Sequence, residues 1–303
     1  MDLDLSSIGI TKLRKFGRKY NISDTSKYNK NNRRILENKI KDAFNNIKKP
    51  KLKRKKTKKN NSISLPIKIS NLPRRSNFER NIEENEFLEM LNESYKIYFG
   101  PKGDRKGTRS SKKVDVIHRW IVKKLEEIYD SDRYSVLDEK KVPSNNSVGY
   151  KNCDVVVFDK IKKEPILVVP VKFTCSNFSQ NKNNYFENCV GDCVLLKIKN
   201  PKLKIIPFNI FIKRTPYYLK DTKSVKNKIK KFEIITPKNI SSYKLNEKPF
   251  IYDKSITYIV NSNLHRKKGI INVSNIVDID KVKILSVSKD TKYKTLESII
   301  RKL

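Results

Sequence analysis

Two residues near the middle of the chain have types and positions that suit metal-assisted hydrolysis. Asp154 begins a short apolar run that ends at Phe158, and Lys172 lies near the end of a second run that begins at Pro165. Both runs are rich in β-branched residues and are separated by polar turn residues, which predicts two buried strands joined in a hairpin. Because lysine is seldom buried without a partner or a role, Lys172 invites a functional interpretation.

The elements that must position these two residues follow a definite order. Hydrophobic residues at helical spacing from Val114 to Ile128 predict an amphipathic helix, and residues 134–137 are a predicted strand. The two central strands come next, then a helix that includes Glu187, and then a strand at 204–213 in which Pro207 indicates a bulge or an edge position. Further elements are expected as helices at 79–99 and 224–232 and as strands at 233–236, 256–260 and 270–273. The chain is therefore expected to be an α/β (α+β) protein with a mixed central sheet.

The predicted elements follow the order helix, three strands, helix, strand, with an acid on the second strand and a lysine on the third. This pattern resembles the PD-(D/E)xK nuclease superfamily. The resemblance is strongest to type II restriction endonucleases and covers roughly a hundred residues, from 112 to 213. It implies a restriction-endonuclease-like αβββαβ core and a Mg²⁺ cofactor held by Asp154 and by the backbone carbonyl of Val171. Lys172 would orient the attacking water or stabilise the negative charge of the transition state.

The sequence departs from the family pattern at one position. The acid that usually stands two residues before the lysine is replaced by Pro170. Some type II restriction endonucleases carry this acid in the following helix instead. In this sequence the resemblance assigns that position to Glu187, as a catalytic residue and metal ligand. Without such a replacement, the site would be inactive. Other acids considered for this region are Asp192, Asp115, Glu126 and Glu164, whereas His118 is expected to pack on its helix.

Two polar segments are candidates for contact with DNA. The first lies between the lysine and the glutamate and could bond phosphates, or it could form a helix-capping loop. Its candidate residues are Asn177, Gln180, Asn183 and Asn184. The second is a basic turn before Gly269 with the candidates His265, Arg266, Lys267 and Lys268.

The N-terminal part of the chain is expected to form a separate basic unit over residues 1–48. The stretch Thr11–Ile22, together with Lys39-Ile40, resembles a SAP-type helix-link-helix motif, a family that usually binds DNA; a plain basic two-helix hairpin is the alternative. The resemblance implies DNA contacts at Lys12, Arg14, Lys15, Arg18 and Lys19. A dense run of like charge at 48–59 predicts a basic linker over 49–78. The nuclease domain would span 79–303, with its DNA-reading region from about residue 205.

Composition narrows the class of partner. The chain has 69 Lys and Arg against 32 Asp and Glu, a formal net charge of +37. A polyanion such as double-stranded DNA is the first explanation, and compositional drift toward lysine and asparagine is the second. We expect a soluble intracellular protein, cytoplasmic or nucleoid-associated and not secreted, because neither a signal peptide nor a bilayer-spanning run is evident. The four cysteines could bind zinc, but reduced and packed thiols fit their spacing better.

These observations together predict a Mg²⁺-dependent endonuclease that hydrolyses double-stranded DNA, as a sequence-specific type II restriction enzyme does. Cutting both strands would favour a homodimer. One alternative is a nucleic-acid-binding protein that has kept the fold and lost catalysis, as Pro170 suggests. Another is a structure-selective nuclease that acts on junctions or flaps.

Overall fold

The structure, a computed structural model, describes residues 34–40, 77–102, 106–218, 229–264 and 280–303. The chain divides into two compact units, Met1–Ser64 and Leu65–Leu303. In the first unit, residues 34–40 are helical and bury Leu36 and Ile40, which agrees with the expected second helix. The SAP-like residues Lys12, Arg14, Lys15, Arg18 and Lys19 lie outside the described residues.

The second unit is a mixed α/β fold, as predicted. Its helices are α3 (Asn77–Phe99), α4 (Lys112–Glu126), α5 (Phe178–Lys199), α6 (Pro237–Leu245) and α7 (Leu296–Ile300), with a short 3-10 turn η3 (Lys106–Arg109). Its strands are β1 (Tyr134–Pro143), β2 (Tyr150–Asp159), β3 (Glu164–Val169), β4 (Val171–Thr174), β5 (Lys204–Ile205), β6 (Phe208–Ile212), β7 (Arg214–Tyr218), β8 (Ile229–Ile234), β9 (Ile256–Ser262) and β10 (Ile284–Val287). From α4 to β6 the chain runs helix, four strands (β1–β4), helix and two strands (β5 and β6), where the sequence predicted helix, three strands, helix and strand.

The strands form two four-stranded sheets and a separate hairpin. One sheet has the order β1-β2-β3-β5, the other has the order β10-β9-β6-β4, and β7 pairs with β8. The predicted β2–β3 hairpin is confirmed, with antiparallel pairing. Parallel pairing joins β3 to β5 and β4 to β6, so both four-stranded sheets are mixed.

Two prolines divide what the sequence suggested were continuous strands. The run expected at 165–173 is split at Pro170 into β3 and β4, and the run expected at 204–213 is split next to Pro207 into β5 and β6. Proline lacks the N–H that a sheet ladder requires. The same parallel register holds on both sides of the two breaks, so Pro170 lies beside Pro207. The paired prolines therefore lie at the boundary between the two four-stranded sheets.

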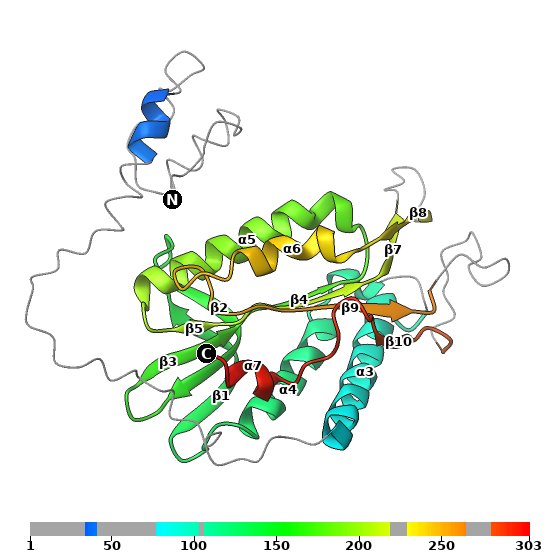
Figure 1. The fold of residues 1–303 in the computed structure, drawn as a ribbon, viewed down its shortest axis with the longest axis horizontal. Helices are drawn as coiled ribbons and strands as arrows, with labels where there is room; N and C mark the ends of the chain where they lie inside the picture. Colours follow the sequence, from blue (N-terminus) through cyan, green and yellow to red (C-terminus); the bar gives the residue numbers. More distant parts are fainter. Residues whose placement is uncertain (1–33, 41–76, 103–105, 219–228, 265–279) are drawn as a thin grey trace, which may run out of the picture. The chain divides into compact units, whose positions relative to one another are not determined.

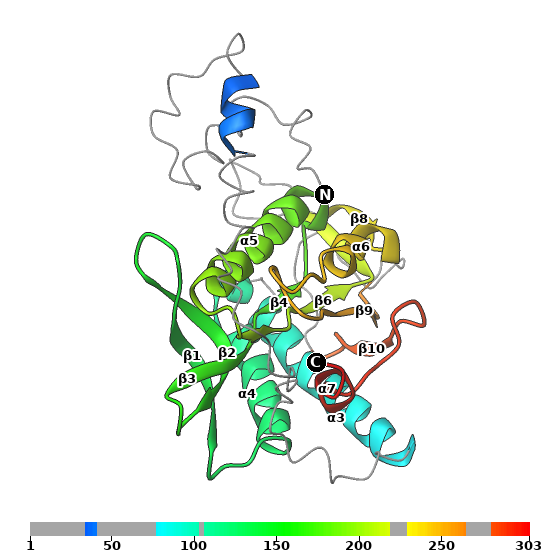
Figure 2. The same cartoon turned by 60° about the vertical axis from the view of Figure 1, so that its left-hand side comes forward.

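Helices cover both faces of this strand system. In both views α5 and α6 lie on one side, while α3, α4 and α7 lie on the other (Figures 1 and 2). Side chains of β6 alternate between them: Phe208 and Ile210 pack in the core with α3 and α4, whereas Phe211 packs with α5 and α6. Helix α4 buries Ile117 and Ile121 completely, as the sequence pattern predicted.

The C-terminal half differs most from expectation. The basic helix expected at 224–232 is wrong for residues 229–232, because these belong to strand β8, which pairs with β7. The sequence did not predict β7, α6, β10 or α7, and the strand expected at 270–273 and the basic turn His265, Arg266, Lys267 and Lys268 lie outside the described residues. No helix in the described part of the chain has both the length and the apolar character needed to cross a bilayer.

Candidate functional site

The site is centred on Asp154, at the fork where the two sheets part. The β2–β3 ladder pairs Val155 with Val169, so the next position places Asp154 opposite Pro170. After Pro170 the chain no longer pairs with β2, and β4 pairs with β6 in the other sheet. The side chain of Asp154 bridges the fork, because its Oδ2 accepts a hydrogen bond of 2.6 Å from the backbone N–H of Val171. The sequence-predicted acid therefore lies directly beside the strand that carries Lys172.

Lys172 lies on β4 in a partly buried position next to an aromatic ring. Its Nζ lies 3.9 Å from the centroid of the Tyr185 ring on α5, a cation–π contact. Burial lowers the pKa of the Lys172 ammonium below its ordinary value, an effect that the nearby Asp154 carboxylate opposes and that Lys113 reinforces. A lysine that is desolvated beside a carboxylate is typical of functional sites as well as of structural ion pairs.

A pocket of about 180 Å³ joins the two predicted residues. Asp154, Val171 and Lys172 line it together with polar side chains from α5 and β6. Among these is Asn209, which is buried next to Lys172 in the β4–β6 register and whose Nδ2 has no hydrogen-bond partner among the described residues. The remaining lining residues are Lys151, Asn152, Cys153, Val168, Pro170, Tyr185, Asn188, Cys189, Asp192 and Leu196.

Helix α4 adds an acid and a histidine to the same region. Asp115 and His118 are three residues apart, so they lie on one face of the helix. The Nε2 of His118 lies 4.0 Å from Oδ1 of Asp154, and the imidazole is almost completely buried. Sequence analysis considered Asp115 as an outer acid but expected His118 only to pack on its helix, and it gave no sign that the histidine faces three carboxylates.

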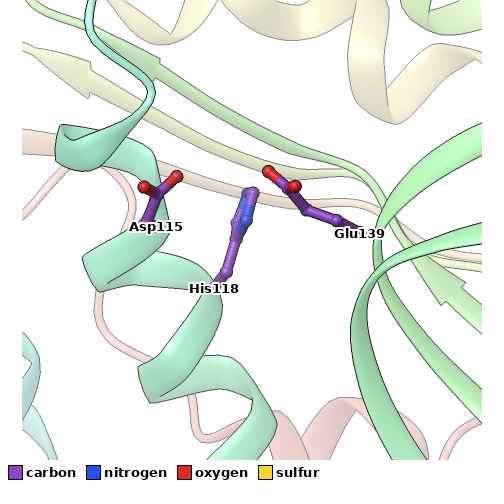
Figure 3. A group of neighbouring side chains, drawn as sticks. All are labelled: Asp115, His118 and Glu139. Carbon is purple, nitrogen blue, oxygen red and sulfur yellow. The ribbon is translucent and has the colours of Figure 1, made fainter.

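Glu139 on β1 is the residue that sequence analysis missed. The residues before and after it pair with Val155 and Cys153 of β2, so Glu139 lies opposite Asp154. Its backbone has a φ of 46°, a left-handed conformation that non-glycine residues rarely adopt within a strand. Its carboxylate points toward His118, which lies between Glu139 and Asp115 (Figure 3). The ligand atoms of Asp115, His118 and Glu139 all lie within 4.8 Å of one another.

The structure does not bring Glu187 to this pocket. The residues of α5 that line the pocket include Tyr185, Asn188, Cys189 and Asp192, which recur at helical spacing on one face. An α-helix turns by about 100° per residue, so Glu187 projects roughly opposite to that face, and its side chain is exposed. Its role as the displaced acid remains a prediction that this geometry does not support.

Asp192, the predicted rival of Glu187, does line the pocket. Its carboxylate lies 2.9 Å from the Nζ of Lys151, and the two side chains form an ion pair at the pocket rim. Glu126, also considered, is exposed at the end of α4, and Glu164 lies at the start of β3 beside Lys162 at 3.9 Å. Of the acids predicted to complete the site, Asp192 and Asp115 are the ones placed near Asp154.

The four polar candidates after Lys172 have different roles in the fold. Asn177 precedes α5 in a left-handed conformation and holds Tyr218, accepting a 3.0 Å bond from its N–H and donating a 3.3 Å bond to its carbonyl. Gln180 accepts a bond from Asn177 and is otherwise exposed. Asn183 and Asn184 are exposed on α5 and are therefore accessible to a partner.

The cysteines are free thiols in the structure. Cys153, Cys175 and Cys193 are buried, and Cys189 is partly buried. Burial, reinforced by Asp154, raises the pKa of Cys153 to about 12. Among the described residues, the group with a geometry suited to a metal ion contains no cysteine.

Comparison of the chain with family models, with curated proteins and with solved structures finds no match.

Proposed function

We propose that the chain is a Mg²⁺-dependent DNA endonuclease with a restriction-endonuclease-like core, acting on double-stranded DNA as a sequence-specific type II enzyme. The observation that carries the proposal is the convergence of Asp154, Val171 and Lys172 at the fork of the sheets. These three residues come from two strands, line one pocket and are the positions that the resemblance assigned to chemistry. The net charge of +37 supports a polyanionic substrate.

The residues at the fork suit a hard divalent cation. Mg²⁺ is commonly held by one or two carboxylates together with several waters. Oδ2 of Asp154 is engaged by the Val171 N–H, while Oδ1 has no hydrogen-bond partner among the described residues, and the side chain is 38% exposed. Asp154 and the Val171 carbonyl would hold the ion, which when bound neutralises the phosphate and lowers the pKa of water.

The chain's own groups would then position the reaction. The Lys172 ammonium, fixed against the Tyr185 ring, would donate a hydrogen bond to the attacking water or to a phosphate oxygen. The unpartnered Nδ2 of Asn209 beside it is a second donor that could face the substrate. Water is partly excluded here, because Asn209 is buried and Lys172 is partly buried.

A nucleic-acid-binding protein without catalysis is the second candidate, favoured by two observations. Pro170 carries no carboxylate at the family's usual position, and Glu187 faces away from the pocket. Under this reading the fold and the positive charge remain useful for binding, while the metal site is incomplete.

One experiment separates the two functions. The full chain is incubated with long duplexes of varied sequence and with Mg²⁺, beside Asp154→Asn and Lys172→Met variants. Discrete fragments that both variants abolish would support the endonuclease, and cleavage of branched substrates only would indicate a structure-selective enzyme. Binding without any cleavage would support the second candidate. Glu126→Gln and Lys199→Met are matched controls, since both residues are exposed and lie outside the pocket.

A further inference from the structure

Asp115, His118 and Glu139 form a group whose chemistry differs from that of the Asp154 pocket. Two of the three residues come from α4 and one from β1, and all three side chains converge (Figure 3). The group combines one imidazole with two carboxylates, and its ligand atoms lie within 4.8 Å of one another. We propose that this group is a binding site for a divalent transition-metal ion of the Mn²⁺ class, next to the Mg²⁺ site at Asp154, whose Oδ1 lies 4.0 Å from Nε2 of His118.

The buried histidine is the observation that points to a ligand. His118 is 4% exposed, and its Nε2 is buried without a hydrogen-bond partner among the described residues. A buried polar atom without a partner is destabilising, and native proteins seldom keep one unless water or an ion satisfies it. Nε2 lies 4.0 Å from Oδ1 of Asp154, on the side of the ring where a carboxylate is present, so an ion bound there would satisfy it.

In the part of the chain that the structure describes, the carboxylates of the group also lack partners that would compensate their negative charge. Oδ1 of Asp115 is also buried without a hydrogen-bond partner among the described residues, although its Oδ2 lies 3.4 Å from the Ser111 hydroxyl. The Glu139 carboxylate faces it across the imidazole, and Asp154 lies 4.0 Å from that imidazole on β2. Three carboxylates around one ring repel each other, and a bound cation removes that repulsion.

The backbone of β1 directs Glu139 into the group. The left-handed conformation at Glu139 is unfavourable for a residue with a side chain, and such conformations gather at functional sites. Glu139 lies opposite Asp154 in the β1–β2 ladder, and residues that are opposite each other in a ladder place their side chains on the same face. The side chain of Glu139 is exposed, so its carboxylate has room to rotate.

The donor set decides which class of metal fits. Mg²⁺ and Ca²⁺ prefer oxygen ligands, whereas imidazole nitrogen favours first-row transition metals. One nitrogen and two carboxylates form a mixed set that suits Mn²⁺, Fe²⁺ or Zn²⁺. The site is therefore expected to discriminate against Mg²⁺, unlike the oxygen-only set at Asp154.

Metal binding to the full chain, without DNA, tests this inference independently of cleavage. The protein is freed of metal with a chelator and titrated with Mn²⁺, and electron paramagnetic resonance follows free and bound ion. Pulsed measurements detect coupling between bound Mn²⁺ and a ¹⁴N nucleus. We expect one Mn²⁺ with nitrogen coupling and competition by Mg²⁺ only at concentrations at least about tenfold higher.

Single substitutions assign the ligands. His118→Gln should remove the nitrogen coupling, and Asp115→Asn and Glu139→Gln should each weaken Mn²⁺ binding about tenfold or more. Glu126→Gln is the matched control on the same helix and should bind as the native chain does. Because Glu139 is exposed, its variant should remain folded even if His118→Gln does not, and circular dichroism checks each one.

The possible outcomes separate this inference from the proposed function. Nitrogen-coupled Mn²⁺ in a chain that cuts no DNA would support the metal site and contradict the proposed nuclease function. DNA cleavage with bound Mn²⁺ that shows no nitrogen coupling would keep the nuclease and overturn the site. Loss of fold stability in His118→Gln together with no Mn²⁺ binding by the native chain would also overturn it, since His118 would then be a structural ion-pair partner.

Discussion

Burial and the nearby Asp154 carboxylate shift the pKa of Lys172 in opposite directions. Burial holds the pKa of its ammonium below the ordinary value of 10.5, despite the attraction of Asp154. Between the lowered folded pKa and 10.5 the unfolded chain binds more protons, so stability rises with pH across that window. Below that window both states are protonated, and the whole cost of burying the charge remains. Lys172 thus lowers the stability of the fold under the conditions in which it would act.

Replacing Lys172 with methionine should therefore separate function from stability. Lys172→Met removes the buried charge and keeps the apolar stem against Tyr185, so its Tm at pH 7 should equal or exceed that of the native chain. Cleavage should fall about a hundredfold or more, because one positioned donor to the reacting phosphate is lost. Calorimetry and cleavage rates measure the two effects, with Lys199→Met as the control. A clearly lower Tm would show that the contacts with Asp154 and Tyr185 stabilise the fold on balance.

Glu187 and Glu139 offer a test of which acid contributes to cleavage. Glu187 is exposed and faces away from the pocket, so Glu187→Ala should change the cleavage rate by less than about twofold, as surface changes usually do. Glu139 lies opposite Asp154, and Glu139→Gln should reduce cleavage about tenfold or more. Rates under single-turnover conditions compare the two. The reverse order of effects would restore Glu187 as the displaced acid and require α5 to rotate when DNA binds.

The sequence could indicate part of this site and not the rest for a physical reason. Asp154 and Lys172 stand out because a charged residue in an apolar β run is unusual. Glu139 lies among charged neighbours on an exposed stretch of β1, where a carboxylate is ordinary. Its position beside Asp154 depends on the β1–β2 register, which does not follow from residue types alone.

Among the elements, η3 shows how closely the backbone packs next to the site. A side chain at Gly107 would place Cβ 1.7 Å from the carbonyl oxygen of Ile97, near the end of α3. The three nearest atoms all belong to the backbone of Ile97 and Tyr98, which leaves no room for the methyl group. We expect Gly107→Ala to destabilise the fold by about 3 kcal/mol or more, which lowers Tm by roughly 6 °C or more.

Gly149 provides the comparison for this substitution. Its φ is +81°, but no atom lies within 4 Å of the position that a Cβ would occupy. Gly149→Ala should therefore cost only about 1 kcal/mol, from backbone strain alone. Thermal melting of both variants checks the order. Equal costs would mean that η3 moves away from α3 without much penalty.

The end of α5 is held to β5 by a buried carboxylate. Asp253 accepts bonds from Lys197 at 2.7 Å, from Lys204 at 3.0 Å and from the N–H of Ile205 at 2.9 Å. Burial alone would raise the pKa of Asp253, but these donors together hold it below the ordinary value. The stabilisation is therefore complete above the unfolded pKa and is lost as the pH falls through the lower folded value.

Asp253→Asn should reveal this contribution. The change leaves the buried Lys197 without its charged partner, so stability at pH 7 should fall by about 3 kcal/mol. The loss should begin to shrink below about pH 4, where the unfolded carboxylate takes up a proton, and should disappear once the native carboxylate is neutralised at its lower folded pKa. Urea unfolding at several pH values measures both effects. Asp290→Asn is the control, since Asp290 and Lys213 form an exposed pair and its removal should change little.

The extent of each element was harder to predict than its presence. The apolar runs at 165–173 and 204–213 were recognised as strands, and both are. Their division at the two prolines depends on pairing: a proline is tolerated at an edge, but these two lie side by side inside the sheet system. Residues 229–232 contain two lysines and resemble part of a solvated helix in sequence, yet the hairpin with β7 makes them part of strand β8.

At the scale of the whole molecule, charge is the property most readily linked to a partner. The excess of 37 positive charges gives the chain a long-range attraction to polyanions that does not depend on the details of one pocket. Phosphate contacts supply most of the affinity for DNA of arbitrary sequence, whereas base contacts supply specificity. The charge and the pocket at the fork should consequently respond to different changes in conditions.

Binding to non-cognate duplex DNA should therefore depend steeply on salt. Each phosphate contact lowers the slope of log affinity against log salt by about 0.9, so a protein with about six contacts has a slope near −5. Fluorescence anisotropy with a labelled duplex between 50 and 200 mM KCl, with EDTA to prevent cleavage, measures it. Asp154→Asn should keep the same slope, because it alters the pocket and adds no phosphate contact. An affinity that does not change with salt would show that the lysine content is due to compositional drift. The proposed nuclease would then lack its main source of affinity for DNA.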